Sequence, residues 1–210
     1  VYYYENTYQI SYDANGGSGA PATQTKKHFT DLTLSKITPT RSGYTFKGWS
    51  TVRNGSVVYA PGSVLSANGN RILYAVWNEK TYTVSFDANG GTGAPGSINK
   101  RYSAPATIPF TEPTRSGYVF RGWSPYSTAL SAMYLPGDYY RFNVSRTLYA
   151  VWEKIPETYT VSYSANGGTG APATQTKTEN IDLTLSSVIP TRKGYTFLGW
   201  SKNGSGQADY

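Results

Sequence analysis

The chain has 210 residues, no cysteine, a single histidine and a formal net charge of +7. The absence of cysteine excludes disulfide bonds, thiolate metal sites and a cysteine nucleophile. No run approaches the ~20 apolar residues that a membrane-spanning helix needs, so no membrane insertion is expected. Twenty tyrosines, seven phenylalanines and five tryptophans supply large apolar side chains for small cores.

The same unit occurs three times. A motif of the form Asn-Gly-Gly-x-Gly-Ala-Pro begins at Asn15, Asn89 and Asn166, with spacings of 74 and 77 residues. A second motif, Gly-Tyr-x-Phe-x-Gly-Trp-Ser, follows at similar offsets in every copy. Repetition at a nearly fixed period predicts a tandem array in which each unit folds locally.

We assign repeat 1 to residues 1–78, repeat 2 to 79–155 and repeat 3 to 156–210, with 1–6 as the stub of a preceding repeat. By the same alignment, repeat 3 stops before its last strand. We therefore expect repeat 3 to be incompletely folded, or to be completed by strand pairing with a neighbouring chain through its exposed edge.

Four strands are predicted in each complete repeat. In repeat 1 they cover residues 8–12, 22–28, 44–49 and 72–77. The first alternates apolar and polar residues, the second is polar as an edge strand should be, and the last is apolar on both faces and therefore predicted to be central and covered on both sides.

The segments between the predicted strands are less regular. The Asn-Gly-Gly segment is a turn, because asparagine and glycine tolerate positive φ. Gly48 and its equivalents, inside the third strand, indicate a bulge. A short apolar segment that includes Leu32 and Ile37 fits either one helical turn or irregular coil.

These motifs resemble the Listeria–Bacteroides repeat family, whose type member is the B-repeat of a listerial internalin. The resemblance rests on the strand 82–86, on Pro113-Thr114-Arg115 with the following Gly-Tyr-x-Phe-x-Gly-Trp motif, and on the segment 148–152. It covers two repeats in full and the third in part. It implies a mainly β, β-grasp-like α+β fold with minimal helix, in which the first and last strands lie parallel at the centre of a mixed sheet.

The resemblance also bears on function. Such repeats occur in large bacterial surface and secreted proteins, as stalks or accessory adhesion modules, and the family motif contains no catalytic residues. This implies a non-catalytic segment in an extracellular location, at the cell surface or secreted.

Two cationic positions recur in all three repeats and are the candidate ligand-binding residues. They are Lys26, Lys100, Lys177, Arg41, Arg115 and Arg192. Spaced cations along a repeat array could bind polyanionic surface polymers or host glycans by charge. The alternative is that each is a surface residue, with the arginine stem packed over an aromatic ring. The net charge falls from +4 and +3 in the first two repeats to zero in the third, which does not indicate a specific nucleic-acid site.

Other chemistry is weakly supported. His28 is not repeated, Asp13 has a serine equivalent in repeat 3, and the glycine-rich loop has neither the Lys-Ser/Thr nor the helix of a phosphate-binding loop. No metal site, cofactor or enzyme activity is therefore predicted. Trp49 and its equivalents fit a packing role better than a carbohydrate platform. The leading hypothesis is a structural stalk or spacer, and the alternative is an adhesin module for anionic polymers or glycans.

Overall fold

A computed structural model describes residues 1–202 and 208–210 of the chain. The described residues are all-β and contain no helix, so none of them forms a helix that could cross a membrane. The chain forms two compact units, Val1–Thr114 with Phe120–Val151, and Arg115–Val119 with Trp152–Tyr210. The part of repeat 3 at residues 203–207 lies outside the described residues.

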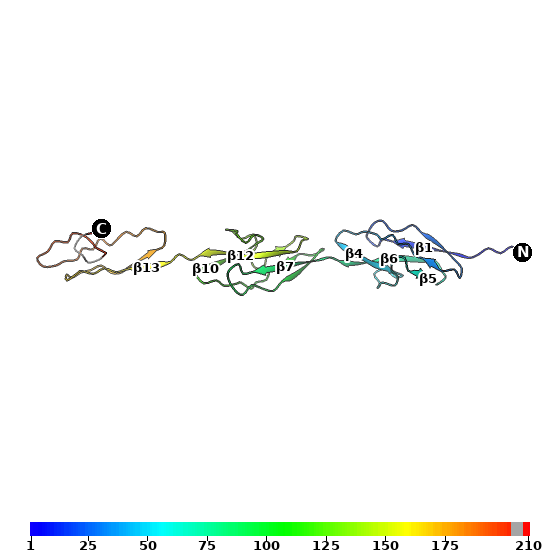
Figure 1. Ribbon diagram of the computed structural model, residues 1–210, viewed down its shortest axis with the longest axis horizontal. Helices are drawn as coiled ribbons and strands as arrows, with labels where there is room; N and C mark the ends of the chain where they lie inside the picture. Colours follow the sequence, from blue (N-terminus) through cyan, green and yellow to red (C-terminus); the bar gives the residue numbers. More distant parts are fainter. Residues whose placement is uncertain (203–207) are drawn as a thin grey trace. The chain divides into compact units, whose positions relative to one another are not determined.

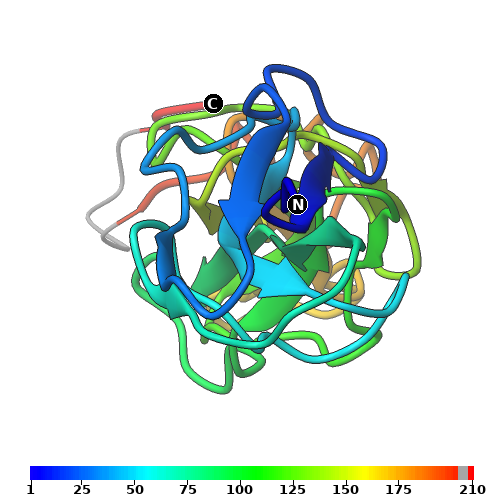
Figure 2. The ribbon, with the colours of Figure 1, turned by 90° about the vertical axis from the view of Figure 1, so that its right-hand side faces the viewer.

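Repeat 1 contains a four-stranded mixed sheet in the order β2-β1-β6-β4. Figure 1 labels β1, β4 and β6 of this sheet, and Figure 2 shows the ribbon turned by 90°. Its strands are β1 (Thr7–Asp13), β2 (Gln24–Lys27), β4 (Tyr44–Ser50) and β6 (Arg71–Glu79). β1 pairs with β6 in parallel, and both outer pairings are antiparallel. This confirms the predicted mixed sheet with the first and last strands at its centre.

Repeat 2 repeats that sheet in the order β10-β12-β7-β8. Its strands are β7 (Thr81–Asp87), β8 (Ile98–Arg101), β10 (Tyr118–Ser124) and β12 (Arg146–Lys154). The central pair, β7 and β12, is again parallel. The equal lengths of equivalent strands show that the same alternation pattern specifies the same sheet twice.

A second, two-stranded sheet covers one face in each complete repeat. β3 (Leu32–Thr33) pairs with β5 (Val64–Leu65) in repeat 1, and β9 (Ala106–Thr107) pairs with β11 (Tyr139–Tyr140) in repeat 2. The short apolar segment that includes Leu32 and Ile37 therefore begins as a strand. Both predicted alternatives, a helical turn and irregular coil, were wrong for its first two residues. Two paired residues are too few to give a periodic sequence signal.

The core of repeat 1 lies between the two sheets. Its buried members are Ile10, Leu34, Trp49, Leu65, Leu73 and Ala75. The prediction that the last strand is covered on both faces was wrong for β6, because Leu73 is fully buried while its neighbour Ile72 is 49% exposed. In β12 of repeat 2, by contrast, the neighbours Ala150 and Val151 are both buried. The small sheet covers only one side of β6, which leaves the other side in contact with solvent.

The predicted bulge is present in β4. The pairing of β4 with β6 shifts register between Phe46 and Gly48, and Gly48 has a φ of 146°. A Cβ atom at Gly48 would lie 2.6 Å from Val57 Cγ1 and 2.8 Å from the Tyr59 carbonyl oxygen. Glycine is thus required both by the backbone conformation and by the segment that crosses over it.

Repeat 3 has a smaller sheet. β13 (Thr158–Val161) pairs with β14 (Gln175–Thr178) in an antiparallel hairpin. Within the described part of repeat 3, no further strand joins this hairpin. The segment equivalent to β4 and β10 is not a strand, and within it the Trp200 backbone hydrogen-bonds with Asp209 and Tyr210.

Candidate functional site

The Asn-Gly-Gly segment forms a tight turn at the end of β1 in repeat 1. Asn15 and Gly16 both have positive φ, 48° and 87°, and the Gly17 amide donates to the Ala14 carbonyl oxygen at 3.0 Å. These are the features of a type I′ turn. The Asn15 amide also donates to Asp13 Oδ1 at 2.7 Å, so the carboxylate caps the turn. The turn recurs at Asn89 and Asn166 with nearly the same angles.

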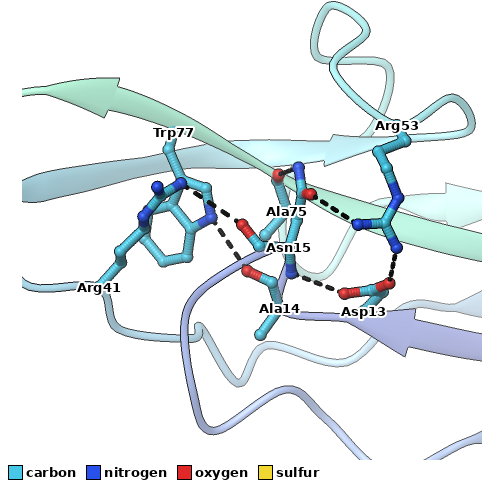
Figure 3. Close-up of polar contacts among 7 residues, drawn as sticks. All are labelled: Asp13, Ala14, Asn15, Arg41, Arg53, Ala75 and Trp77. Atoms are coloured by element: carbon cyan, nitrogen blue, oxygen red, sulfur yellow. Dashed lines mark hydrogen bonds and ion pairs between the residues drawn. The ribbon is translucent and has the colours of Figure 1, made fainter.

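This turn is tied to the last strand of its own repeat (Figure 3). The Asn15 carboxamide donates through Nδ2 to the Ala75 carbonyl oxygen at 3.0 Å, and Trp77 Nε1 donates to the Ala14 carbonyl oxygen at 3.0 Å. In repeat 2, Asn89 Nδ2 donates to the Ala150 carbonyl oxygen at 2.9 Å. The asparagine carboxamide of the turn and the Ala14 carbonyl oxygen therefore help to close the repeat.

The recurring arginines share one local contact. Each guanidinium stacks on a tyrosine three residues later, with the Cζ atom 3.9–4.1 Å from the ring centroid; the pairs are Arg41 with Tyr44, Arg115 with Tyr118 and Arg192 with Tyr195. Arg41 Nη1 also donates to the Asn15 carbonyl oxygen at 3.4 Å, and Arg192 Nη1 to the Asn166 carbonyl oxygen at 3.1 Å. The predicted stacking over an aromatic ring is thus present in all three repeats.

The recurring lysines lie elsewhere in the fold. Lys26 is 1% exposed, and its Nζ donates to Asn68 Oδ1 at 2.9 Å and to the Lys27 carbonyl oxygen at 3.1 Å. Lys100 is 2% exposed, and its Nζ donates to Asn143 Oδ1 at 2.5 Å. Through these hydrogen bonds, Lys26 joins β2, and Lys100 joins β8, to the crossover segment that precedes the last strand. We call this contact the lysine clasp.

Lys177 is half-buried, and its Nζ donates to the Thr178 and Ile181 carbonyl oxygens at 2.7 and 2.5 Å. The structure therefore does not bring the six candidate cations together. The lysines lie within or beside the cores, whereas Arg41 and Arg192 lie beside the turns of repeats 1 and 3.

A further cluster lies at the junction of repeats 1 and 2. The Lys80 amide donates to the Gly43 carbonyl oxygen at 2.9 Å, and the Tyr102 amide donates to the Lys80 carbonyl oxygen at 3.0 Å. The Tyr102 ring covers Gly43 and lies 6.1 Å from the Tyr44 ring in an edge-on contact. The Tyr102 hydroxyl shares a 3.1 Å hydrogen bond with Ser42 Oγ.

Charged groups reinforce this junction. The Ser103 amide donates to Glu79 Oε1 at 2.7 Å, and Arg101 Nε donates to Glu79 Oε2 at 2.8 Å. The hydrogen bonds from Ser103, and then the Arg101 guanidinium, lower the pKa of Glu79 to about 2. The equivalent position to Glu79 is Lys154, which pairs with Glu179 at 2.8 Å, so the signs of the charges are reversed there.

The tryptophans and the histidine lie in packed settings. Trp49 and Trp123 are fully buried, each between two aromatic rings, and their Nε1 atoms have no hydrogen-bond partner. Their buried rings have no exposed face on which a sugar could stack. His28 Nδ1 lies 2.6 Å from the Tyr8 hydroxyl. In residues 1–202 and 208–210, no three His, Asp or Glu side chains gather to hold a metal ion.

Sequence reasoning missed the lysine clasp and the junction cluster. The clasp joins Lys26 to an asparagine 42 residues away in the least regular segment of the repeat. The two clasp asparagines, Asn68 and Asn143, are 75 residues apart, and this recurrence was a signal that could have found them. Tyr102 gave no such signal, because the equivalent residues are His28 and Glu179.

The chain is similar to several bacterial proteins. It is 33% identical to a putative Gly-rich membrane protein of Evansella cellulosilytica over 93% of this chain and 22% of that protein. It is 28% identical to a putative membrane protein of the same organism, over 97% of this chain and 30% of that protein. It is 29% identical to Internalin H of Listeria monocytogenes, over 44% of this chain and 16% of that protein.

The chain thus spans less than a third of the length of each of these relatives. No solved structure matches it. The Listeria-Bacteroides repeat domain matches residues 8–76, 82–151 and 159–210, which include the turn, the stacked arginine and the buried or half-buried lysine of each copy. The chain therefore belongs to the Listeria-Bacteroides repeat domain family, a family found in bacterial surface proteins, and carries three copies of the domain.

Proposed function

We propose that this chain is a non-catalytic structural segment, a spacer or stalk, of a bacterial cell-surface or secreted protein. The observation that carries the proposal is the use made of the recurring polar side chains. The asparagine, lysine and arginine of the repeat bond to backbone or side-chain atoms of the same repeat. Residues that recur because each copy must fold do not need a common ligand to explain their recurrence.

The junction of repeats 1 and 2 supports the same proposal. A spacer needs consecutive units that are held to one another as well as folded. Here Lys80 bonds to Gly43 on one side and to Tyr102 on the other. An extracellular location fits the relatives, which are named as membrane proteins or as an internalin.

The alternative is an adhesin module that binds anionic polymers or glycans. The specific observation in its favour is that the three arginines recur in one stacked geometry and remain half-buried or exposed. The lysines contribute less to this alternative, because two of them are almost completely buried.

Retention on immobilised heparin at low ionic strength separates the two hypotheses. The spacer proposal predicts weak retention that does not change when Arg41 and Arg115 are both replaced by alanine. The matched control replaces Lys47 and Arg121, two exposed cations on β4 and β10. Strong retention that only the Arg41 and Arg115 substitutions abolish would contradict the spacer proposal and establish the adhesin.

A further inference from the structure

The Asn68 carboxamide lies between two hydrogen-bond donors. Asn68 belongs to the crossover segment between β5 and β6 of repeat 1, and its Oδ1 accepts from Lys26 Nζ at 2.9 Å and from the Phe29 amide at 3.2 Å. Lys26 is 1% exposed, so its ammonium group acts in a setting with little solvent. Two donors, one of them charged, therefore polarise the Asn68 carbonyl group in the way that the donors of an oxyanion hole do.

The Phe29 backbone adopts an unusual conformation at this contact. Phe29 has a φ of 52°, in the left-handed region that bulky residues rarely occupy. Its side chain is 86% exposed, so burial of the ring does not compensate for the strain. The conformation instead directs the Phe29 amide at Asn68. Strained residues of this kind cluster at sites that perform chemistry.

The residue after Asn68 leaves the carboxamide open to attack. A Cβ atom at Gly69 would meet nothing within 4 Å, and the Gly69 amide donates to no other residue that the structure describes. Asn68 is only half-buried, so water reaches the segment. A backbone amide with neither a side chain nor a hydrogen bond in its way can close a cyclic imide onto the preceding carboxamide, which is the ordinary route by which asparagine loses ammonia.

The buried ammonium group of Lys26 has no carboxylate partner among the described residues. Its Nζ donates to Asn68 Oδ1 and to the Lys27 carbonyl oxygen, which are both neutral acceptors. Buried charges are ordinarily paired, because the desolvation of an unpaired charge is costly. A carboxylate in place of the Asn68 carboxamide would supply the missing counter-ion.

We propose that Asn68 is a self-modification site, which folded repeat 1 converts into a carboxylate that pairs with Lys26. The Gly69 amide nitrogen forms a bond to Asn68 Cγ, while Lys26 and Phe29 stabilise the oxyanion that develops on Oδ1. The bond from Cγ to Nδ2 then breaks, and Nδ2 leaves as ammonia with the proton of the Gly69 amide. Water adds its hydroxyl to one imide carbonyl carbon and its proton to the imide nitrogen, which leaves aspartate or isoaspartate at position 68. The inference goes beyond the spacer proposal and is independent of it.

Two other asparagines of the chain provide the comparison. Asn143 accepts from Lys100 in the same clasp, but the next residue is Val144, whose branched side chain hinders ring closure. Asn54 is followed by a glycine but lies outside any lysine clasp, and the Gly55 amide already donates a turn hydrogen bond at 3.0 Å. Modification is therefore expected at position 68, and it should be slower at positions 54 and 143.

The test incubates the complete chain at neutral pH and follows the loss of ammonia at each asparagine by peptide mass spectrometry. The reference is a synthetic peptide with the sequence of residues 64–72, which has the same Asn-Gly pair without the fold. Position 68 should react about tenfold faster in the folded chain than in the peptide, since one donor of an enclosed oxyanion hole contributes about 10²–10³-fold and Asn68 is half-exposed. An equal or slower reaction in the folded chain would overturn the proposal, as would a cross-link between Lys26 and Asn68, because Nζ would then be the nucleophile.

Chain variants test the two parts of the proposal separately. Lys26→Met removes the charged donor and should slow the reaction at position 68 about tenfold. Val144→Gly keeps the clasp of Lys100 intact and creates an Asn-Gly pair beside it, so position 143 should become reactive. For the product, Asn68→Asp should melt at a higher temperature than the unmodified chain, and Asn68→Ala at a lower one. An unreactive position 143 in Val144→Gly, or an Asn68→Asp variant that melts no higher than the unmodified chain, would contradict the proposal.

Discussion

Gly43 and Gly117 are equivalent glycines with the same φ of 75° and different surroundings. A Cβ atom at Gly43 would lie 2.2 Å from two ring carbons of Tyr102, whereas a Cβ atom at Gly117 would meet nothing within 4 Å. Gly43→Ala and Gly117→Ala therefore impose the same backbone strain, about 1–2 kcal/mol for a non-glycine residue in this region. Only Gly43→Ala must also displace the Tyr102 ring.

The additional cost follows from the contacts that the ring makes. Displacement removes the edge-on contact between Tyr44 and Tyr102, which contributes about 0.5–1.5 kcal/mol. It also removes the hydrogen bond between Ser42 and Tyr102, which contributes about 0.5–1.5 kcal/mol. Gly43→Ala should thus weaken the junction by about 1–3 kcal/mol more than the shared backbone strain, a factor of roughly 5 to 150 in the local opening equilibrium.

Amide hydrogen exchange by NMR measures this opening residue by residue. In Gly43→Ala we expect faster exchange of the Lys80 and Tyr102 amides. The increase should exceed the increase at the Ile155 amide in Gly117→Ala by the factor given above. Ile155 is the matched reporter, because its amide donates to the Gly117 carbonyl oxygen as Lys80 donates to Gly43. Equal changes at the two junctions would refute the reasoning, since the Tyr102 contact would then contribute nothing.

Three further predictions concern stability. Hydrogen bonds hold the pKa of Glu79 at about 2, below its ordinary 4.5, so the stabilisation of the junction is complete above about pH 4.5 and is lost as the pH falls through 2. Glu79→Gln should abolish this pH dependence in the exchange of the Ser103 amide, and an unchanged pH profile would contradict the prediction. Asn15→Ala should lower the free energy of unfolding by about 2 kcal/mol, through a lost hydrogen bond and a positive φ, and Asn15→Gly by only about 1 kcal/mol; thermal denaturation that ranks the two variants the other way would count against the turn's role. Lys26→Ala should lower the free energy of unfolding by about 1–3 kcal/mol, because Lys26 is buried, whereas its exposed neighbour Lys27 should tolerate alanine within about 1 kcal/mol; equal effects in urea denaturation would argue against the clasp.

The sheet could be predicted from the sequence because its signal is local. Alternation in residues 8–12 and the glycine within 44–49 each act on their own segment, and three copies made the pattern unambiguous. The β3–β5 pairing could not be predicted, since two residues carry no period. The exposure of Ile72 was missed for another reason. An apolar run indicates a central strand, but which of its faces is covered depends on where the small β3–β5 sheet packs.

The site was harder to predict because recurrence does not distinguish a ligand contact from a folding contact. Lys26 is on a polar edge strand, where lysine is ordinarily solvated, and its burial depends on Asn68 from the crossover segment. Arg41 was correctly expected to pack over an aromatic ring, because Tyr44 follows it at a fixed offset in every copy. The Tyr102 contact depends on two repeats together, so no single copy could indicate it.

The central claim is that the chain acts as a spacer, and cell-surface display tests it most directly. A reporter domain is fused before residue 1 and a cell anchor after residue 210. The assay measures binding to the reporter of an antibody that is excluded from the capsule layer. This binding is compared between the complete fusion and the same fusion lacking residues 79–155. The spacer account predicts that antibody binding to the reporter falls when repeat 2 is removed. It also predicts that the loss is restored when repeat 2 is replaced by a second copy of repeat 1. Antibody binding that does not depend on the number of repeats would contradict the account.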